Sequence, residues 1–387
     1  MGITKRLNWQ NIFIFLFLII FPFGQITRIG ILQPIDLVVG LAAIYTIVKR
    51  LEIPQAFKYF GIFVIFASAT WFFSIFIFRQ IEVLYGLLYV FRLTAYYFFG
   101  IYVYGFVRRA KENKKLLIDS LLGVSVFSSL FGWVQFFLIP DIKPLFKYGW
   151  DIHLLRLVGT FLDPTFLGLI IVFGLLIAVT RMIEGKNNKQ IGIIIFFLVS
   201  LAFTYSRAGY LALFGGLILI ALYKKILKKV LFLILIFVAL LFLLPTSKNH
   251  SIELLRQFSA VARIEDYKNT IQIFSKSPVF GIGYNNMCIA YQKFIGAQPF
   301  NSHHCSGSDS SLLLVLATTG ITGFMLFIFS ISRIIHSFSK NPDVLLLGSV
   351  SVALLIHSFF SNSMFYPWIM GYLAILFAVA VKKQSSE

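Results

Sequence analysis

Long apolar runs separated by short polar connections set the pattern of this chain. A helix needs roughly 20 apolar residues to cross about 30 Å of hydrocarbon, and runs of about this length recur from end to end. Twelve predicted spans lie near residues 10–26, 29–48, 57–78, 83–106, 115–139, 159–180, 190–205, 208–223, 230–245, 309–331, 344–361 and 363–381. The pattern therefore predicts an all-α, polytopic integral membrane protein of about 12 transmembrane helices.

One long polar interval interrupts this pattern. Residues 245–308 lie between the ninth and tenth predicted spans and form the largest predicted loop. Within it, Ile264, Tyr267 and residues 269–274 show helical spacing of apolar positions, which predicts an amphipathic helix on the membrane surface. No internal repeat or soluble domain is evident, so residues 1–387 are predicted to form a single transmembrane domain that includes this loop.

The distribution of charged residues predicts the orientation of the chain in the membrane. The residues are 59% hydrophobic and 13% charged, with a net charge of +19. In a soluble protein this charge would suggest nucleic acid as a partner, but here the basic residues concentrate in every second connection. By the positive-inside rule, those connections and both termini face the cytoplasm. We expect a multi-pass protein of the bacterial inner membrane, with no nucleic-acid partner and an extracytoplasmic 245–308 loop.

Arg207 is the first candidate for chemistry, because it lies in a polar turn between two short apolar segments. Residues 191–204 rise about 21 Å as a helix, so the turn is expected below the outer headgroups. An intramembrane charge costs about 2.5 to 3.5 kcal/mol or more unless it is compensated, so Arg207 is predicted to meet an anion or water.

Other charged residues gather on the predicted outer side. They are Arg156, Asp163, Arg263, Glu265, Asp266, His303, His304 and Asp309. The planar fork of arginine binds phosphate bidentately, so two or three arginines can hold a diphosphate, the leaving group of lipid-linked sugar donors. A carboxylate or an imidazole nearby would then activate an acceptor hydroxyl.

Each of these residues also has a structural interpretation. Asp309 precedes a run of leucines and suits a helix N-cap. Arg156 suits an interfacial anchor, and Arg263 suits a pair with Asp266 or with the neighbours of Tyr267 on a surface helix. Arg92 lies well inside the fourth predicted span and needs a partner, either a lipid phosphate or Glu82.

The two cysteines, Cys288 and Cys305, both fall in the 245–308 loop, where a disulfide is chemically permitted. His303, His304 and Cys305 carry metal-ligating groups, but adjacent residues rarely converge on one ion. We therefore predict no metal site and no cofactor.

Four stretches together are similar to a known family. They are Arg156–Pro164, Ser206–Gly209, Arg263 leading to Pro278–Gly283, and Asp309–Ser311 with Gly320 and Gly323. In this order they resemble the O-antigen ligase and O-antigen polymerase superfamily of bacterial envelope polysaccharide enzymes. The ligase pattern has a histidine, an asparagine or similar residue, nine residues, a glycine, two residues and a glycine. Counting back from Gly320 and Gly323 places Asp309 where the ligases have histidine.

The resemblance implies a glycosyltransferase-C-like fold, a lipid-linked donor and specific roles for residues. Arg207 and Arg263 would bind the diphosphate of an undecaprenyl-linked oligosaccharide, with Arg156 and Arg92 as helpers. Asp309, His303 or His304 would take the proton from the glycan acceptor. Partners would be this donor, the acceptor, membrane lipid and a chain-length regulator protein.

The missing histidine favours polymerase over ligase. The expected reaction is therefore metal-independent, inverting polymerisation of lipid-linked repeat units into a surface polysaccharide, with transfer to a lipid or protein acceptor as the alternative. A flippase for lipid-linked sugars is the second alternative. Because most charges cluster on one face, whereas a carrier places its site near the midplane, we prefer an enzyme to a flippase. A structural scaffold fits the polar outer loop least well.

Overall fold

A computed structural model of the chain describes residues 11–28, 33–78, 81–148, 150, 152–185, 189–245, 258–296, 307–337 and 342–381. Every regular element within these ranges is a helix. Contacts divide the chain into two compact units, each built from three segments. Unit 1 comprises Met1–Leu37, Ala110–Arg256 and Lys340–His357, and unit 2 comprises Val38–Arg109, Gln257–Ser339 and Ser358–Glu387.

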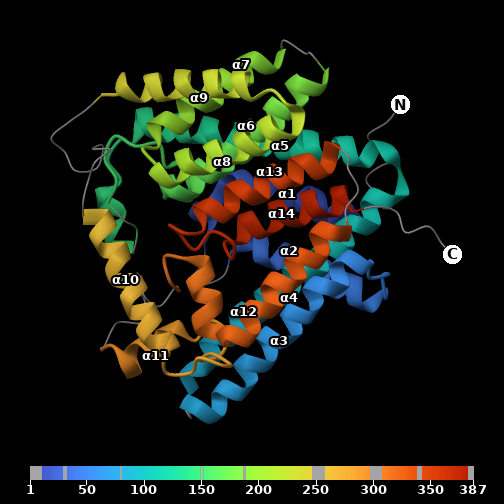
Figure 1. The fold of residues 1–387 in the computed structure, drawn as a ribbon, viewed down its shortest axis with the longest axis vertical. Coiled ribbons are helices and arrows are strands. Elements are labelled where there is room, and N and C mark those ends of the chain that lie inside the picture. Colours follow the sequence, from blue (N-terminus) through green and yellow to red (C-terminus); the bar gives the residue numbers. More distant parts are fainter. Residues whose placement is uncertain are drawn as a thin grey trace. The chain divides into compact units, whose positions relative to one another are not determined.

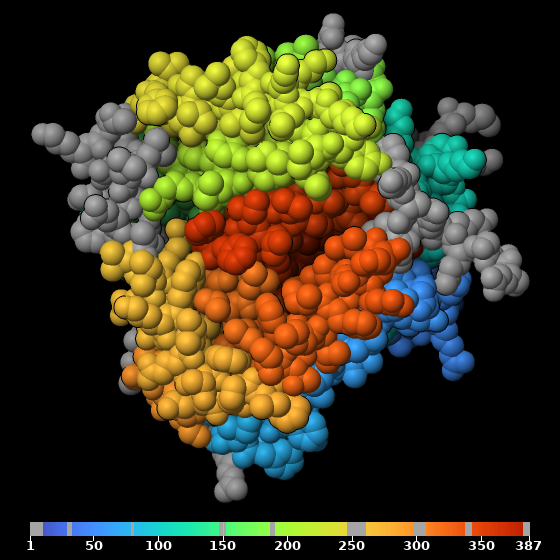
Figure 2. Space-filling view, viewed as in Figure 1, coloured from blue at the N-terminus to red at the C-terminus, as the bar shows by residue number. Residues whose placement is uncertain are grey.

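Unit 1 is organised around one buried helix. Its helices are α1 (Ile12–Ile20), η2 (Phe21–Thr27), α5 (Lys111–Leu138), η4 (Lys143–Tyr148), η5 (Gly159–Phe161), α6 (Pro164–Gly185), α7 (Lys189–Phe203), α8 (Arg207–Lys224), α9 (Leu227–Phe242) and α13 (Pro342–His357). Almost every residue of α6 up to Thr180 is buried. Helix α8 packs against α13, where a side chain at Gly215 would collide with Ile356, and the two run side by side in Figure 1. Helix α9 lies at the surface, in yellow-green in Figure 2.

Unit 2 is built around two pairs of packed helices, α3 with α12 and α4 with α14. Its helices are α3 (Gln55–Phe78), η3 (Ile81–Val83), α4 (Leu84–Arg109), α10 (Phe258–Phe274), α11 (Met287–Phe294), α12 (Ser311–Ser337) and α14 (Pro367–Ala380). Helix α12 packs along α3, and α14 packs along α4 (Figure 1). Helix α2 (Pro34–Val48) begins in unit 1 and continues into unit 2. Buried apolar side chains such as Phe63 and Val315 fill the interior.

Six helical stretches in the described parts of the chain are long and apolar enough to cross a membrane unaided. They are Gln55–Phe78, Ile81–Arg109, Glu112–Leu138, Pro164–Gly185, Arg207–Lys224 and Ser311–His336. Helices α2, α7, α13 and α14 are apolar but shorter. The prediction of an all-helical, polytopic membrane protein is confirmed at this level. The count of twelve crossings, the single domain and the likeness to glycosyltransferase-C folds stay predictions.

The start of α6 differs from the predicted span 159–180. Gly159 and Leu162 both have positive φ angles, of 58° and 54°, which break a helix before Pro164. Proline suits the first helical position, because its missing N–H has no intrahelical partner there. Helix α6 therefore begins at Pro164 and continues to Gly185, beyond the predicted end.

The long polar interval contains the helix that the apolar spacing suggested. Helix α10 is longer than predicted, and Val261, Ile264 and Ile271 are exposed on it. Asp266 and Thr270 are buried on the same helix. The buried face is therefore polar at its centre, a feature that the apolar spacing does not show. Attachment of α10 to the membrane surface stays a prediction.

Candidate functional site

The turn between α7 and α8 positions Arg207 in unit 1. Tyr205 adopts a left-handed conformation with φ of 50°, and its hydroxyl donates a hydrogen bond to the Pro245 carbonyl at 2.8 Å. The Ser206 hydroxyl oxygen accepts the Gly209 N–H at 3.2 Å and caps α8. Arg207 is consequently the first residue of α8 and is half-buried.

Arg156 binds this same turn. Its side chain is only 3% exposed, its Nε donates to the Thr204 carbonyl at 2.9 Å, and its Nη2 donates to the Tyr205 carbonyl at 3.3 Å. Carbonyls at the end of a helix have no intrahelical partner, so the guanidinium satisfies groups that α7 leaves open. Arg156 is thus buried in unit 1 rather than placed as an interfacial anchor, and the structure brings it to the turn that precedes Arg207.

Asp163 has a local role within unit 1. Its Oδ1 accepts the backbone N–H of Thr165 at 2.6 Å and that of Phe166 at 3.4 Å. This is the geometry of an N-cap for α6. Asp163 therefore needs no ligand to explain its position.

A buried carboxylate joins α10 to the start of α12 in unit 2. Asp266 is 4% exposed, and its Oδ2 accepts the Ser308 hydroxyl at 2.8 Å and the Asp309 backbone N–H at 2.9 Å. Charge-assisted bonds of this kind are roughly twice as strong as neutral ones. Asp266 therefore fixes the backbone from which the Asp309 side chain projects.

The N-cap of α12 lies one residue later than the sequence suggests. The Ser310 hydroxyl oxygen accepts the Leu313 N–H at 3.4 Å, and the helix begins at Ser311. Ser310 rather than Asp309 is thus the capping residue. Asp309 is half-buried, whereas Ser310 is buried.

Tyr267 marks a point where several charges of unit 2 meet. Burial raises the pKa of Tyr267, the Arg263 charge opposes this rise, and Asp309 and Asp266 add to it. The Tyr267 hydroxyl donates a hydrogen bond to the Phe359 carbonyl. The charges of one arginine and two carboxylates of the candidate set therefore all act on a single tyrosine. We call Arg263, Asp266, Tyr267 and Asp309 the α10–α12 cluster.

The neighbouring Tyr291 of α11 extends this arrangement. Asn269 donates its Nδ2–H to the Tyr291 hydroxyl at 2.6 Å. Burial raises the pKa of Tyr291, and nearby Asp266 and Asp309 raise it further, against the Asn269 hydrogen bond. Both tyrosines near the carboxylates are therefore held in their neutral, hydrogen-donating form over a wide pH range.

Two of the stretches that carry the resemblance, Pro278–Gly283 and the one with Gly320, lie against each other through backbone hydrogen bonds. The Ile321 N–H donates to the Pro278 carbonyl at 2.8 Å, and the Ile282 N–H donates to the Ala317 carbonyl at 3.1 Å. Helix α12 breaks at Gly320, where φ is 68° and a Cβ would lie 2.3 Å from the Val279 carbonyl oxygen. Close approach of two backbones accounts for this glycine, independently of any reaction.

Arg92 lies on α4 of unit 2. Its Cζ is 5.4 Å from the centroid of the Tyr89 ring, within the range of a cation–π contact. Its charge also lowers the pKa of the buried Tyr284, although burial raises that pKa by more. The role of Arg92 in donor binding stays a prediction.

His303, His304 and Cys305 lie outside the described residues. Cys288, in α11, is disulfide-bonded. The catalytic assignments of His303, His304 and Asp309, and the donor-binding assignments of Arg156, Arg207 and Arg263, stay predictions. For Asp266 the sequence suggested only an ion pair with Arg263, and its hydrogen bonds to Ser308 and Asp309 were not predicted. The spacing of Asp266, Thr270 and Ile273 places them on one helix face, and that spacing is the signal that was available.

Fold and site together define an all-helical membrane protein with cationic and acidic side chains fixed by buried hydrogen bonds. Residues 192–328 match the family model described as O-antigen ligase. This match supports the O-antigen ligase and polymerase superfamily, as the four motifs indicated, and the family implies enzymes of the membrane glycosyltransferase type. The matched range contains Arg207, the whole α10–α12 cluster and Gly320. A comparison with curated proteins finds no match.

Proposed function

We propose that the protein polymerises undecaprenyl-diphosphate-linked oligosaccharide repeats into a surface polysaccharide at the outer face of the cytoplasmic membrane. The observation that carries this proposal is the α10–α12 cluster inside the family-matched range. In it Asp266 bonds to the backbone of Asp309, and the charges of Arg263, Asp266 and Asp309 act on Tyr267. The family supports transfer of a lipid-linked glycan. Choosing polymerase within it rests on Asp309, which occupies the place of the ligase histidine.

The reaction needs a diphosphate group that leaves and an acceptor hydroxyl that attacks. The bond between the anomeric carbon and the diphosphate oxygen breaks while the acceptor oxygen forms a new bond from the opposite face, so the sugar inverts. We assign diphosphate binding to Arg207 and Arg263, with Arg156 and Arg92 in support. Negative charge grows on the departing oxygens, and each fixed donor in a partly dry site contributes roughly 3 to 4 kcal/mol to the transition state.

Asp309 is assigned as the group that takes the acceptor proton, with His303 and His304 as alternatives. Its backbone is held by Asp266 at 2.9 Å, and its cap role is filled by Ser310. The Asp309 carboxylate is therefore not required to cap the helix. A carboxylate that projects from a backbone held in this way suits general-base chemistry, which needs the base within hydrogen-bond reach of the hydroxyl.

Transfer of the glycan to a different acceptor is the alternative, and the O-antigen ligase description of the matched family favours it. The two reactions share the donor and differ in the acceptor. In the polymerase the acceptor is a second lipid-linked glycan. In the ligase it is a lipid or protein that carries no diphosphate.

Purified protein in lipid vesicles with a lipid-linked oligosaccharide as the sole glycan separates these reactions. We expect a ladder of longer diphosphate-linked glycans, resolved by gel and by mass spectrometry. A new product only after addition of a separate lipid or protein acceptor would replace the polymerase with a ligase. Redistribution of the oligosaccharide between leaflets with no new glycosidic bond would reject both and indicate a carrier.

A further inference from the structure

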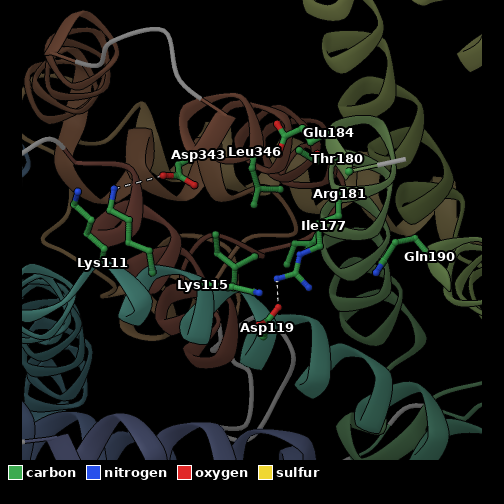
Figure 3. A pocket seen from close by; sticks show the side chains of 13 residues that line it. Lys111, Lys115, Asp119, Ile177, Thr180, Arg181, Glu184, Gln190, Asp343 and Leu346 are labelled. Atoms are coloured by element: carbon green, nitrogen blue, oxygen red, sulfur yellow. Dashed lines mark hydrogen bonds and ion pairs between the residues drawn. The ribbon is translucent and has the colours of Figure 1, made fainter. Parts of the chain in front are cut away.

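Unit 1 contains a cleft of about 570 Å³ at the opposite end of α7 from the Arg207 turn. Residues from α5, α6, α7 and α13 line it, and Figure 3 shows their side chains. Helix α7 has 15 residues and rises about 22 Å between the two sites. If Arg207 faces the outer leaflet, as the topology predicts, this cleft faces the inner one.

Helix lengths place the cleft at the level of lipid headgroups. Helix α5 has 28 residues and is about 42 Å long, which exceeds a hydrocarbon thickness of about 30 Å. The lining residues of α5, from Lys111 to Asp119, occupy its first nine positions. Arg181 and Glu184 come from the last turns of α6. The cleft is therefore formed where two candidate spans end.

Ion pairs in the cleft account for its carboxylates. Arg181 pairs with Asp119, and Lys114 Nζ lies 3.4 Å from Asp343 Oδ2; dashed lines mark both pairs in Figure 3. Glu184, the third acidic residue of the lining, lies 3.7 Å from Lys224 of α8. Each acidic side chain of the lining thus has a basic partner.

Lys111 and Lys115 add positive charge beyond these pairs. Both are exposed and line the cleft. Helices α5, α7 and α13 also begin at the cleft, and the N-terminal ends of helices carry partial positive charge. The electrostatic environment therefore favours an anion, and lysine is a common partner of phosphate.

The other side chains of the cleft suit an amphiphilic ligand. Ile118, Ile177 and Leu346 provide apolar surface beside the lysines. Gln190, also in the lining, has a buried Oε1 without a hydrogen-bond partner among the described residues. An acceptor of this kind suits a ligand that carries a hydroxyl group close to its phosphate.

We propose that this cleft binds the phosphate group of an anionic phospholipid from the leaflet that faces the cytoplasm. The phosphate lies against Lys111 and Lys115, and the start of an acyl chain contacts Ile118 and Leu346. Basic pockets between transmembrane helices recognise lipid headgroups in this way. Free phosphate shares the chemistry, but the headgroup depth and the apolar lining favour a lipid. This inference rests on the membrane placement of unit 1 and not on the proposed reaction.

Native mass spectrometry of the full chain tests the proposal. The protein is equilibrated with mixed micelles of phosphatidylglycerol and phosphatidylcholine, and the retained phosphatidylglycerol is counted. Neutralising a lysine near an anionic surface is expected to weaken binding about fivefold, and the double variant Lys111→Gln, Lys115→Gln roughly 25-fold. Both substitutions leave the two ion pairs of the cleft wall intact.

The matched control is Lys228→Gln with Lys229→Gln, which removes the same charge from exposed positions on α9 outside the lining. Retention close to that of the unmodified chain is expected for this control. Equal losses in both double variants would mean that only general surface charge acts, and would overturn the proposal.

A second arm identifies the source of the phosphate. Thermal unfolding is followed in phospholipid-free detergent as inorganic phosphate replaces chloride at constant ionic strength. No change in Tm is expected if the ligand is a lipid. A rise in Tm that the cleft variant abolishes would assign the cleft to soluble phosphate and reject the lipid. Because both arms measure binding, their outcome is independent of any polymer assay.

Discussion

The Arg207 turn of unit 1 and the α10–α12 cluster of unit 2 fix their charges by opposite means. In the turn, a buried arginine donates to backbone carbonyls of Thr204 and Tyr205. In the cluster, a buried carboxylate accepts from a hydroxyl and a backbone N–H. Arg156 thereby bonds to the turn that precedes Arg207, and Asp266 bonds to the backbone of Asp309. Arg207 and Asp309 are half-buried and are proposed to contact substrate.

The degree of burial separates residues that position the backbone from residues proposed to contact substrate. Arg156 and Asp266 are 3% and 4% exposed, and their hydrogen bonds to the protein account for their burial without a ligand. Arg207 and Asp309 are more exposed, and each follows a backbone segment held in place by its neighbour. Substitution of the half-buried pair, Arg207 and Asp309, should change turnover, whereas substitution of the buried pair, Arg156 and Asp266, should change stability first.

Asp309 gives the largest expected effect. Replacement of Asp309 by Asn keeps the size of the side chain but removes its ability to accept a proton, and general-base catalysis typically contributes 10²- to 10⁴-fold. We expect polymer formation by purified Asp309→Asn to fall by at least about 100-fold, measured as initial rates of glycan extension. Thermal stability should change little, because Ser310 caps α12.

The control for this prediction is Ser310→Ala, which removes the cap itself. Loss of an N-cap hydroxyl costs about 1 kcal/mol, so this variant should lower Tm more than Asp309→Asn does. An Asp309→Asn protein with the full rate of extension would exclude Asp309 as the base.

Arg207 comes next. Its replacement by Ala removes a fixed donor to the diphosphate, and loss of one such donor costs about 10²- to 10³-fold in turnover. Arg207→Lys keeps the charge but loses the planar fork, so it should recover only part of the rate. Initial extension rates measure both variants, with membrane expression checked by immunoblot.

The exposed Arg333 at the end of α12 is the matched arginine control. Arg333→Ala should keep a normal rate, because within the described residues its guanidinium contacts the Tyr59 side chain and is assigned no part in the reaction. A normal rate of polymer formation in Arg207→Ala would exclude Arg207 from the mechanism. The chemical role would then fall to the α10–α12 cluster of unit 2.

Asp266 is expected to act mainly on stability. Asp266→Ala leaves the Ser308 hydroxyl and the Asp309 N–H without their acceptor, and a buried donor left unsatisfied costs about 1 to 3 kcal/mol. Asp266→Asn retains an acceptor oxygen and should lie between Ala and the native residue. We expect this order in thermal unfolding. Glu265→Gln, at an exposed neighbouring position, should leave Tm unchanged.

Steady-state kinetics of Asp266→Asn, with kcat and the KM for the acceptor measured separately, distinguish a positioning role from a role in folding alone. If Asp266 orients Asp309, Asp266→Asn lowers kcat at temperatures where the protein is fully folded. A variant with reduced Tm but native kcat would show that Asp266 only supports the fold.

Much of the fold was readable from the sequence because apolar runs need no tertiary information. The helices α3, α4, α5, α6, α8 and α12 fall within or close to predicted spans. Their ends were harder to predict, since the start of α6 depends on positive φ angles at Gly159 and Leu162. Such angles follow from contacts made by the surrounding chain, which the periodicity of apolar residues does not encode.

The candidate site was readable only in part. The sequence indicated that Arg207, Arg263 and Asp309 matter, because charges near a membrane need a reason. It did not show that Arg156 binds backbone carbonyls, or that Asp266 bonds to a residue 43 positions later. Both contacts join segments far apart in the chain, and hydrogen-bond partners at that distance leave no local pattern.

Substitution of Arg156 is expected to change the reaction least. It tests whether this buried arginine stabilises the turn before Arg207. Arg156→Lys keeps a positive charge but replaces a planar fork with a single ammonium, which is unable to reproduce two directed bonds to Thr204 and Tyr205. Hydrogen bonds to charged groups contribute about 1.5 to 3 kcal/mol, so loss of one should lower stability by about that amount. Thermal unfolding of the purified protein measures it.

The arginine at position 156 was also predicted to help bind the diphosphate, and the same variant distinguishes the two roles. If Arg156 acts through the turn, Arg156→Lys lowers Tm, and kcat falls by less than in Arg207→Ala, because Arg207 loses orientation but not its charge. If the guanidinium itself contacts the departing diphosphate, kcat falls with little change in Tm. The second result would mean that the buried Arg156 binds the diphosphate as directly as the half-buried Arg207 does. Burial would then not separate positioning from substrate-binding residues in unit 1.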